Sequence, residues 1–235
     1  MASGIRNTLE PAYVLHSRAY RETSVLLEVL TRSGGRVGLV ARGARGARSR
    51  WKGSLQPFRP LLIGWSQRGE LGTLTAAEQI ASPPALMGET LICGLYANEL
   101  VVRFLQRSDP QPELFDSYAR LLGGLSAGDP PHALLRLFEL QLLESAGFGL
   151  QLDHEHDTGQ AIEPERWYEY VPESGPIRRE APEGGRTELV SGAALLALKS
   201  GHIESAQHKE LRGLMRRLLR FYLGERPLKA QSLFF

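Results

Sequence analysis

Five short runs of branched and aromatic residues fill the first 80 positions of the chain, and turn signals separate them. The runs cover residues 12–18, 24–31, 36–42, 58–66 and 71–80. Their composition and alternation are typical of β-strands. The pair Gly34-Gly35 predicts a tight hairpin between the second and third runs. Five strands in so short a stretch, with glycine at the bends, predict a small closed or nearly closed barrel.

The pattern changes after Pro83 and Pro84. Apolar residues then recur near the helical period over 89–106, 112–122, 132–146, 191–200 and 207–223. We expect Gly123 and Gly124 to end the second of these helices, Asp129 to cap the third, and Ser191 to cap the fourth. Residues 150–190 differ, being acidic, rich in proline and glycine and weakly periodic, although 166–171 could form a strand of a small hairpin.

The sequence therefore predicts an α+β protein with two domains. Residues 1–82 form a five-stranded barrel with the strand count of an oligonucleotide-binding (OB) fold, which binds nucleic acid with one face and its loops. Residues 83–235 form a helical domain with an irregular insertion at about 150–190. No stretch reaches the roughly 20 apolar residues of a membrane span, and no secretory signal is evident, so we expect a cytoplasmic protein.

Charge is unevenly distributed although the net charge is only +2. Residues 1–80 carry 12 Lys/Arg against 5 Asp/Glu, residues 81–204 carry 9 against 19, and residues 205–235 carry 7 against 2. Two basic ends flanking an acidic middle indicate a polyanionic partner for the basic parts.

The densest basic stretch follows the third predicted strand. It contains five cations and an aromatic residue but no acid: Arg42, Arg45, Arg48, Arg50, Trp51 and Lys52. Gly43 and Gly46 interrupt any helix there. A loop of this kind suits a nucleic acid, because the cations neutralise phosphates and the indole can stack on a base. A solvated loop without a ligand is the alternative.

A second basic surface is predicted on the last helix. Leu211, Leu214, Leu218 and Phe221 or Tyr222 would face inward, whereas Arg212, Arg216, Arg217 and Arg220 would face outward. This face either binds a polyanion, meets an acidic partner or membrane surface, or is simply solvated.

Enzyme signatures are weak. The stretch around Lys52 lacks the Gly-Lys-Ser/Thr of a phosphate loop, and no G-x-S-x-G elbow is present. His154 and His156 could share a metal ion if they lie on one strand, but a closed zinc site needs four placed ligands, and an exposed loop is the simpler interpretation. The single cysteine, Cys93, excludes an internal disulfide and a multi-cysteine zinc site. We expect neither catalysis nor a cofactor.

Six segments, in order, resemble the RecO family of bacterial DNA repair proteins. They are AYVLHSRAYRETS at 12–24, GRVGLVARGAR at 35–45, GSLQPF at 53–58, GLYANEL at 94–100, LRLFEL at 135–140 and YLGERPLK at 222–229. Each is weak alone, but together they span nearly the whole chain.

The resemblance implies an N-terminal OB domain followed by a helical domain. It implies a recombination mediator that binds single- and double-stranded DNA, anneals complementary strands, acts with RecR and helps to load RecA onto DNA coated by single-stranded-DNA-binding protein (SSB). Such a protein would be nucleoid-associated. The family's DNA face would fall on the cations of residues 42–52, with help from the C-terminal arginines.

The resemblance also implies a site for the acidic, Phe-ending tail of SSB on the helical domain. The matching position is Arg136, near Tyr96 and Phe138, where a cation would meet carboxylates and an apolar pocket would hold the ring. One departure is clear: many family members carry a four-cysteine zinc module at the equivalent of 150–190, and this chain has no cysteine there. A protein-interaction scaffold and, less favoured, a metal-dependent nuclease built on His154 and His156 remain the alternatives.

Overall fold

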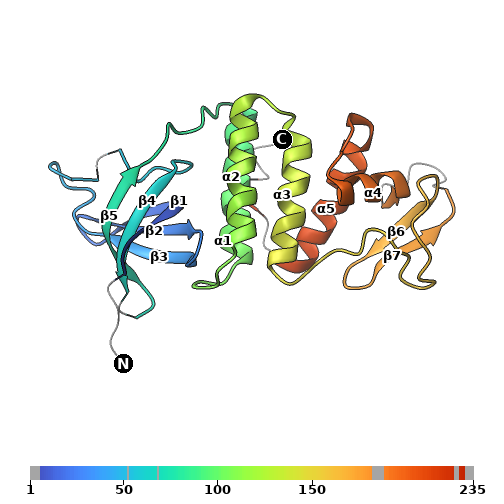
Figure 1. Cartoon of the computed structure of the whole chain (residues 1–235), viewed down its shortest axis with the longest axis horizontal. Helices are drawn as coiled ribbons and strands as arrows, with labels where there is room; N and C mark the ends of the chain where they lie inside the picture. The colour runs from blue at the N-terminus through green and yellow to red at the C-terminus, as the bar shows by residue number, and fades with distance from the viewer. Residues whose placement is uncertain (1–5, 52, 68, 182–187, 225–227, 231–235) are drawn as a thin grey trace. The chain divides into compact units, whose positions relative to one another are not determined.

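The computed structural model describes residues 6–51, 53–67, 69–181, 188–224 and 228–230 (Figure 1). The chain divides into two compact units. The first comprises Met1–Ala127 together with Leu228–Phe235, and the second comprises Gly128–Pro227. The chain changes from strands to helices near residue 82, where we expect the domain boundary. That boundary stays a prediction.

The first unit begins with a closed five-stranded barrel. Its strands are β1 (Arg6–Tyr20), β2 (Ser24–Thr31), β3 (Gly35–Ala41), β4 (Leu61–Gln67) and β5 (Gly72–Gln79). They are arranged in the order β1-β2-β3-β5-β4, and β4 pairs with β1 to close the barrel. The pairing between β3 and β5 is parallel, and the other pairings are antiparallel. The predicted α+β class with an N-terminal OB-fold barrel is confirmed.

The hairpin between β2 and β3 forms where Gly34-Gly35 predicts it, with Thr31 opposite Gly35. Gly35 has a φ of +68°, and a Cβ atom there would lie 1.9 Å from the carbonyl oxygen of Asp109. Only glycine fits this position, both for its backbone conformation and for the space available. The turn thereby holds the barrel against the segment between the next two helices.

Two helices complete the first unit: α1 (Glu89–Phe104) and α2 (Pro112–Ala127). A buried polar chain joins α1 to the barrel, because the Asn98 amide donates to the Leu15 carbonyl oxygen at 2.9 Å and accepts from the Tyr118 hydroxyl. The prediction that Gly123 and Gly124 end α2 was wrong. The helix continues to Ala127, and buried Leu125 shows that packing outweighs the cost of about 1 kcal/mol for each glycine.

The chain returns to the first unit near its C-terminus. The carboxylate of Glu99 on α1 accepts hydrogen bonds from the backbone N–H groups of Lys229 and Ala230, both at 2.9 Å. Leu228 and Ala230 are buried. Residues 228–230 are therefore packed against the first unit, and the terminal residues 233–235 lie outside the described residues.

The second unit contains α3 (Pro131–Ser145), α4 (Gly192–Ser200), the short 3-10 helix η1 (Ser205–Gln207) and α5 (His208–Leu223). Ser191 caps α4 as predicted, because its hydroxyl accepts a hydrogen bond from the N–H of Ala194 at 3.2 Å. The predicted cap of α3 was wrong: Pro130, not Asp129, occupies the N-cap position, and no side chain caps that helix.

The predicted insertion is built around a three-stranded antiparallel sheet, with β6 (Trp167–Val171) between β7 (Gly175–Arg179) and β8 (Leu189–Ser191). Arg178 holds this region together. Its guanidinium donates to the buried carboxylate of Glu155 at 2.6 Å and also pairs with Glu163. Among the described residues, no helix is long and apolar enough to span a membrane.

Candidate nucleic-acid interface

The predicted basic loop leaves β3 at Ala41 and folds as a series of turns. The N–H of Gly46 donates to the Gly43 carbonyl oxygen at 3.1 Å, and that of Ser49 donates to the Gly46 carbonyl oxygen at 3.0 Å. Gly43 has a φ of +68°, which glycine adopts without strain. The loop is thus a folded segment rather than a loose chain.

Trp51 anchors the end of this loop in the barrel. Its side chain is only 6% exposed and belongs to the hydrophobic core that includes Leu27, Leu39 and Ile63. The indole N–H donates to the Arg42 carbonyl oxygen at 3.2 Å, which ties the two ends of the loop together. The guanidinium of Arg50 lies 4.2 Å from the centre of the indole ring.

The expectation that Trp51 stacks on a base therefore needs correction. Its ring faces the core and Arg50, so no open ring face remains for a base. The composition of the loop did not reveal this, because an aromatic residue among arginines serves equally as a stacking platform or as an anchor. Its role in this interface is to fix the loop.

The arginines of the loop, by contrast, are presented to solvent. Arg42, Arg45, Arg48 and Arg50 are all exposed. Among the residues that the structure describes, none of the ion pairs involves these four side chains. Their charge is therefore not neutralised by any acidic residue that the structure describes. Lys52, the fifth predicted cation, lies outside the described residues.

Residues of the β1–β2 turn extend this basic surface. The backbone N–H of Arg45 donates to the Thr23 carbonyl oxygen at 2.8 Å, and its guanidinium reaches the Arg21 carbonyl oxygen at 3.5 Å. Arg21 is itself exposed, although Glu22 beside it carries the opposite charge. Sequence reasoning missed Arg21, because only the pairing of β2 with both β1 and β3 brings that turn to the loop.

The C-terminal arginines lie on α5, in the second unit. As predicted, Leu211, Leu214 and Leu218 are buried, and Arg212, Arg216 and Arg220 are exposed. The outward placement predicted for Arg217 holds only in part. Its guanidinium donates to the Glu188 carbonyl oxygen at 2.6 Å, and burial lowers its pKa. Phe221 was expected to be one of two possible inward residues, but it is 54% exposed.

Arg136 is buried on α3. Its Nη2 atom donates to the carboxylate of Glu139 at 2.6 Å, and its Nε atom has no hydrogen-bond partner. Burial lowers the pKa of His208 at the start of α5, and the nearby charges of His132 and Arg136 lower it further.

The two aromatic residues expected beside Arg136 are also buried. Phe138 is 1% exposed and Tyr96 is 5% exposed, so neither ring offers a free surface to a docking peptide. Tyr96 belongs to the first unit, whereas Arg136 and Phe138 belong to the second. The grouping of Tyr96 and Phe138 around Arg136 therefore stays a prediction.

His154 and His156 provide no metal centre. Within the described ranges, no cluster of three or more His, Cys, Asp or Glu side chains is placed to hold an ion. His154 forms an ion pair with Asp153 at 3.1 Å and is half-exposed. The nuclease alternative therefore gains no support from these histidines.

Comparisons with known proteins cover both parts of the chain. Residues 5–83 match the family model described as "Recombination protein O N terminal", and residues 87–232 match "Recombination protein O C terminal".

Full-length relatives agree with these matches. The DNA repair protein RecO of Methylococcus capsulatus is 46% identical over 230 residues, which cover 97% of this chain and 93% of the relative. The RecO proteins of Nitrosococcus oceani and Alkalilimnicola ehrlichii are 47% and 45% identical, covering 97% and 99% of this chain and 93% and 92% of those relatives. The chain belongs to the RecO family of DNA repair proteins.

Proposed function

We propose that this protein is a recombination mediator that binds single- and double-stranded DNA without reading sequence and anneals complementary strands. The observation that carries the proposal is the loop of exposed arginines, which have no acidic partner among the described residues and are held on the barrel by Trp51. A guanidinium group that is already paired would have to release its carboxylate before it could bind a phosphate. The four loop arginines have no such carboxylate to release among the described residues.

Annealing requires little more than this surface. Two DNA strands repel each other through their phosphates, and cations on a shared protein surface lower that repulsion. Contacts to phosphates leave the base edges free to pair. Base pairing then provides the driving force, so the proposed activity needs no bond-breaking chemistry and no cofactor.

Binding of single-stranded DNA at increasing salt tests the loop. We expect the logarithm of the binding constant to fall linearly with the logarithm of salt concentration, with a slope of about −0.7 for each phosphate neutralised. In Arg45→Glu/Arg48→Glu the slope should be shallower and the affinity lower for every sequence. Unchanged affinity at low salt would remove the loop from the interface.

A matched control separates the loop from net charge. Arg120→Glu changes the same charge at an exposed position on α2. We expect it to weaken DNA binding much less than Arg48→Glu does. Equal losses would mean that DNA responds to the overall charge and not to this loop. Salt-sensitive binding that persists without the loop would shift the interface to Arg212, Arg216 and Arg220.

We further propose that Arg136 receives the acidic tail of SSB, that RecR is a second protein partner, and that the protein helps to load RecA. The Nε atom of Arg136 makes no hydrogen bond among the described residues, but it is buried and its guanidinium is paired with Glu139, so a tail carboxylate would reach it only after a local movement that exposes it. Because Phe138 and Tyr96 are buried, the proposal rests on the cation and not on those rings.

The test must respect the burial of Arg136. Arg136→Ala alone would leave Glu139 buried without a counter-charge and would destabilise the fold. Arg136→Met/Glu139→Gln removes both charges together. We expect this double variant to bind DNA normally but to lose affinity for a labelled peptide copied from the SSB tail. An unaltered peptide titration in a folded double variant would remove Arg136 from the site.

A further inference from the structure

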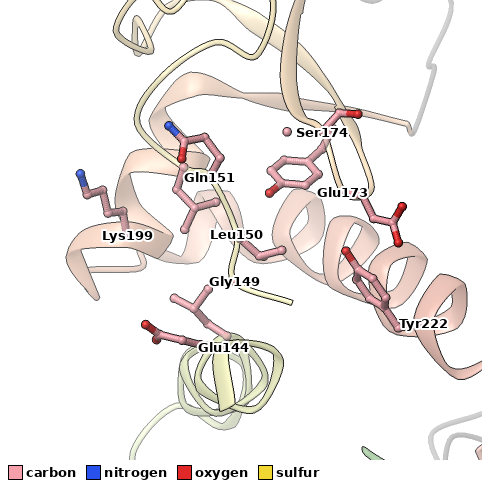
Figure 2. Close-up of a pocket in the computed structure, with 12 residues that line it drawn as sticks. Glu144, Gly149, Leu150, Gln151, Glu173, Ser174, Lys199 and Tyr222 are labelled. Atoms are coloured by element: carbon pink, nitrogen blue, oxygen red, sulfur yellow. The ribbon is translucent and has the colours of Figure 1, made fainter. Parts of the chain in front are cut away.

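A pocket of about 540 Å³ opens in the second unit, between the helices and the β6–β7 hairpin (Figure 2). Glu144, Lys199 and Tyr222 come to it from three different helices, and Glu173 comes from the hairpin turn. Apolar side chains, among them Leu140, also line it. Its volume falls in the range of about 300–1,000 Å³ that is typical of ligand pockets.

Three helix C-termini meet at this pocket. Glu144, Lys199 and Tyr222 are the penultimate residues of α3, α4 and α5 respectively. The last carbonyl groups of a helix carry a partial negative charge equivalent to about half an elementary charge, and they favour cations. The C-terminal ends of these three helices therefore add partial negative charge near the pocket.

The side chains act in the same direction. Glu144 and Glu173 are exposed, and Figure 2 shows Glu173 near Tyr222 on one side of the pocket and Glu144 on the other. Neither carboxylate takes part in the ion pairs found among the described residues. Lys199, the one cation among the lining residues that the structure describes, is already paired with Asp153.

Both acidic residues occupy positions that cost stability. A carboxylate in the last turn of a helix, such as Glu144, opposes the helix dipole. Glu173 has a φ of +63°, a conformation that glycine or asparagine would adopt with less strain. Unfavourable residues that persist in a pocket indicate a functional reason for them.

We infer that this pocket binds arginine or lysine side chains from a basic segment of a partner protein. The aliphatic stem would pack on the leucines while the charged head reaches Glu144, Glu173 and the helix carbonyls. Two acids on opposite sides suit a segment that carries more than one cation. DNA is repelled by the same features, so this site is distinct from the proposed DNA interface and does not depend on it.

A labelled hexa-arginine peptide tests the inference at about 0.1 M salt, with hexa-citrulline as the uncharged analogue. We expect the arginine peptide to bind and the citrulline peptide not to bind. Each of Glu144→Gln and Glu173→Gln should weaken binding about threefold, and the double variant about tenfold, which is the range for exposed charge pairs. Citrulline binding as tight as arginine binding would overturn the assignment.

Glu165→Gln/Glu180→Gln provides the matched control, because both residues are exposed and lie outside the pocket lining. We expect it to change peptide affinity less than twofold. An equal loss in the control would show diffuse attraction to an acidic region and would overturn the pocket. Spermidine is a second competitor. If it bound at Glu144 and Glu173 as tightly as the peptide, the assignment of a protein partner would be overturned. Both double variants should bind DNA like the unaltered protein, so failure here leaves the DNA proposal standing.

Discussion

Arginine serves two different purposes in the two units of this protein. In the loop after β3, four exposed arginines have no acidic partner among the described residues. In the small sheet of the second unit, Arg178 pairs with Glu155 and Glu163, and Arg179 pairs with Glu169 at 2.7 Å. The difference lies entirely in the neighbouring acids.

The unpaired arginines of the loop are available to a ligand, whereas the paired arginines of the small sheet stabilise the fold. A paired guanidinium holds two segments together but has little left to offer a phosphate. An unpaired one contributes almost nothing to stability and remains available. The loop arginines should therefore be replaceable without unfolding, whereas Arg178 should not be, and substitutions can test each half of that statement.

The largest effect is expected at the anchor of the loop. Trp51→Ala removes a core side chain and the hydrogen bond to the Arg42 carbonyl, and it should destabilise the barrel by about 3–5 kcal/mol. Urea unfolding measures this loss. Trp51→Phe should retain much of the stability because it keeps most of the ring. If Trp51→Ala unfolded like the unaltered protein but lost DNA binding, the indole would be a contact residue after all.

Arg178→Ala should have the next largest effect, a clear loss of stability, because it leaves Glu155 buried without its counter-charge. Thermal unfolding of the full chain would detect it. Arg178→Met/Glu155→Gln should recover part of the loss, since it removes both charges. A single variant as stable as the unaltered protein would mean that the ion pairs do not hold this region together.

Sequence patterns were sufficient for the elements whose signals are local. The hairpin at Gly34-Gly35, the strand β2 and the Ser191 cap follow from a few neighbouring residues each. The end of α2 did not follow, because buried Leu125 makes the helix continue through two glycines. Local propensity is a weak guide wherever distant packing contributes more free energy.

Local sequence patterns were also insufficient for the candidate sites. Charge and spacing identified the basic loop, but nothing in the sequence distinguishes an anchoring Trp51 from a stacking one. The addition of Arg21 and the pairing of Arg136 with Glu139 depend on contacts that only the fold creates. The acidic pocket was missed for a similar reason, since Glu144, Glu173 and Lys199 are far apart in the sequence.

Within the basic loop, Arg48→Ala should change the free energy of unfolding by no more than about 0.5 kcal/mol. The loss of one phosphate contact should instead lower the affinity for single-stranded DNA about fivefold at 0.1 M salt, as the counterion relation predicts. Fluorescence anisotropy with labelled DNA measures this change. A strongly destabilised Arg48→Ala would show that the loop arginines are structural, and the contrast with Arg178 would disappear.

The smallest effect is expected at Asp153 in the second unit. Hydrogen bonds from Lys199 and His154 lower the pKa of this carboxyl from its ordinary 3.8 to about 2. Because the folded-state pKa is the lower one, the stabilisation from this pair is complete above about pH 4 and disappears as the pH falls toward 2. The group is exposed, so the contribution is small, and NMR titration of the Asp153 side chain is the appropriate measurement. In Lys199→Met the pKa of Asp153 should rise toward 3.8, while His154 alone still holds it slightly below.

If the titration of Asp153 did not change, the ammonium of Lys199 would not be paired with it. The pocket beside it would then contain a free cation, which would oppose the binding of a basic segment.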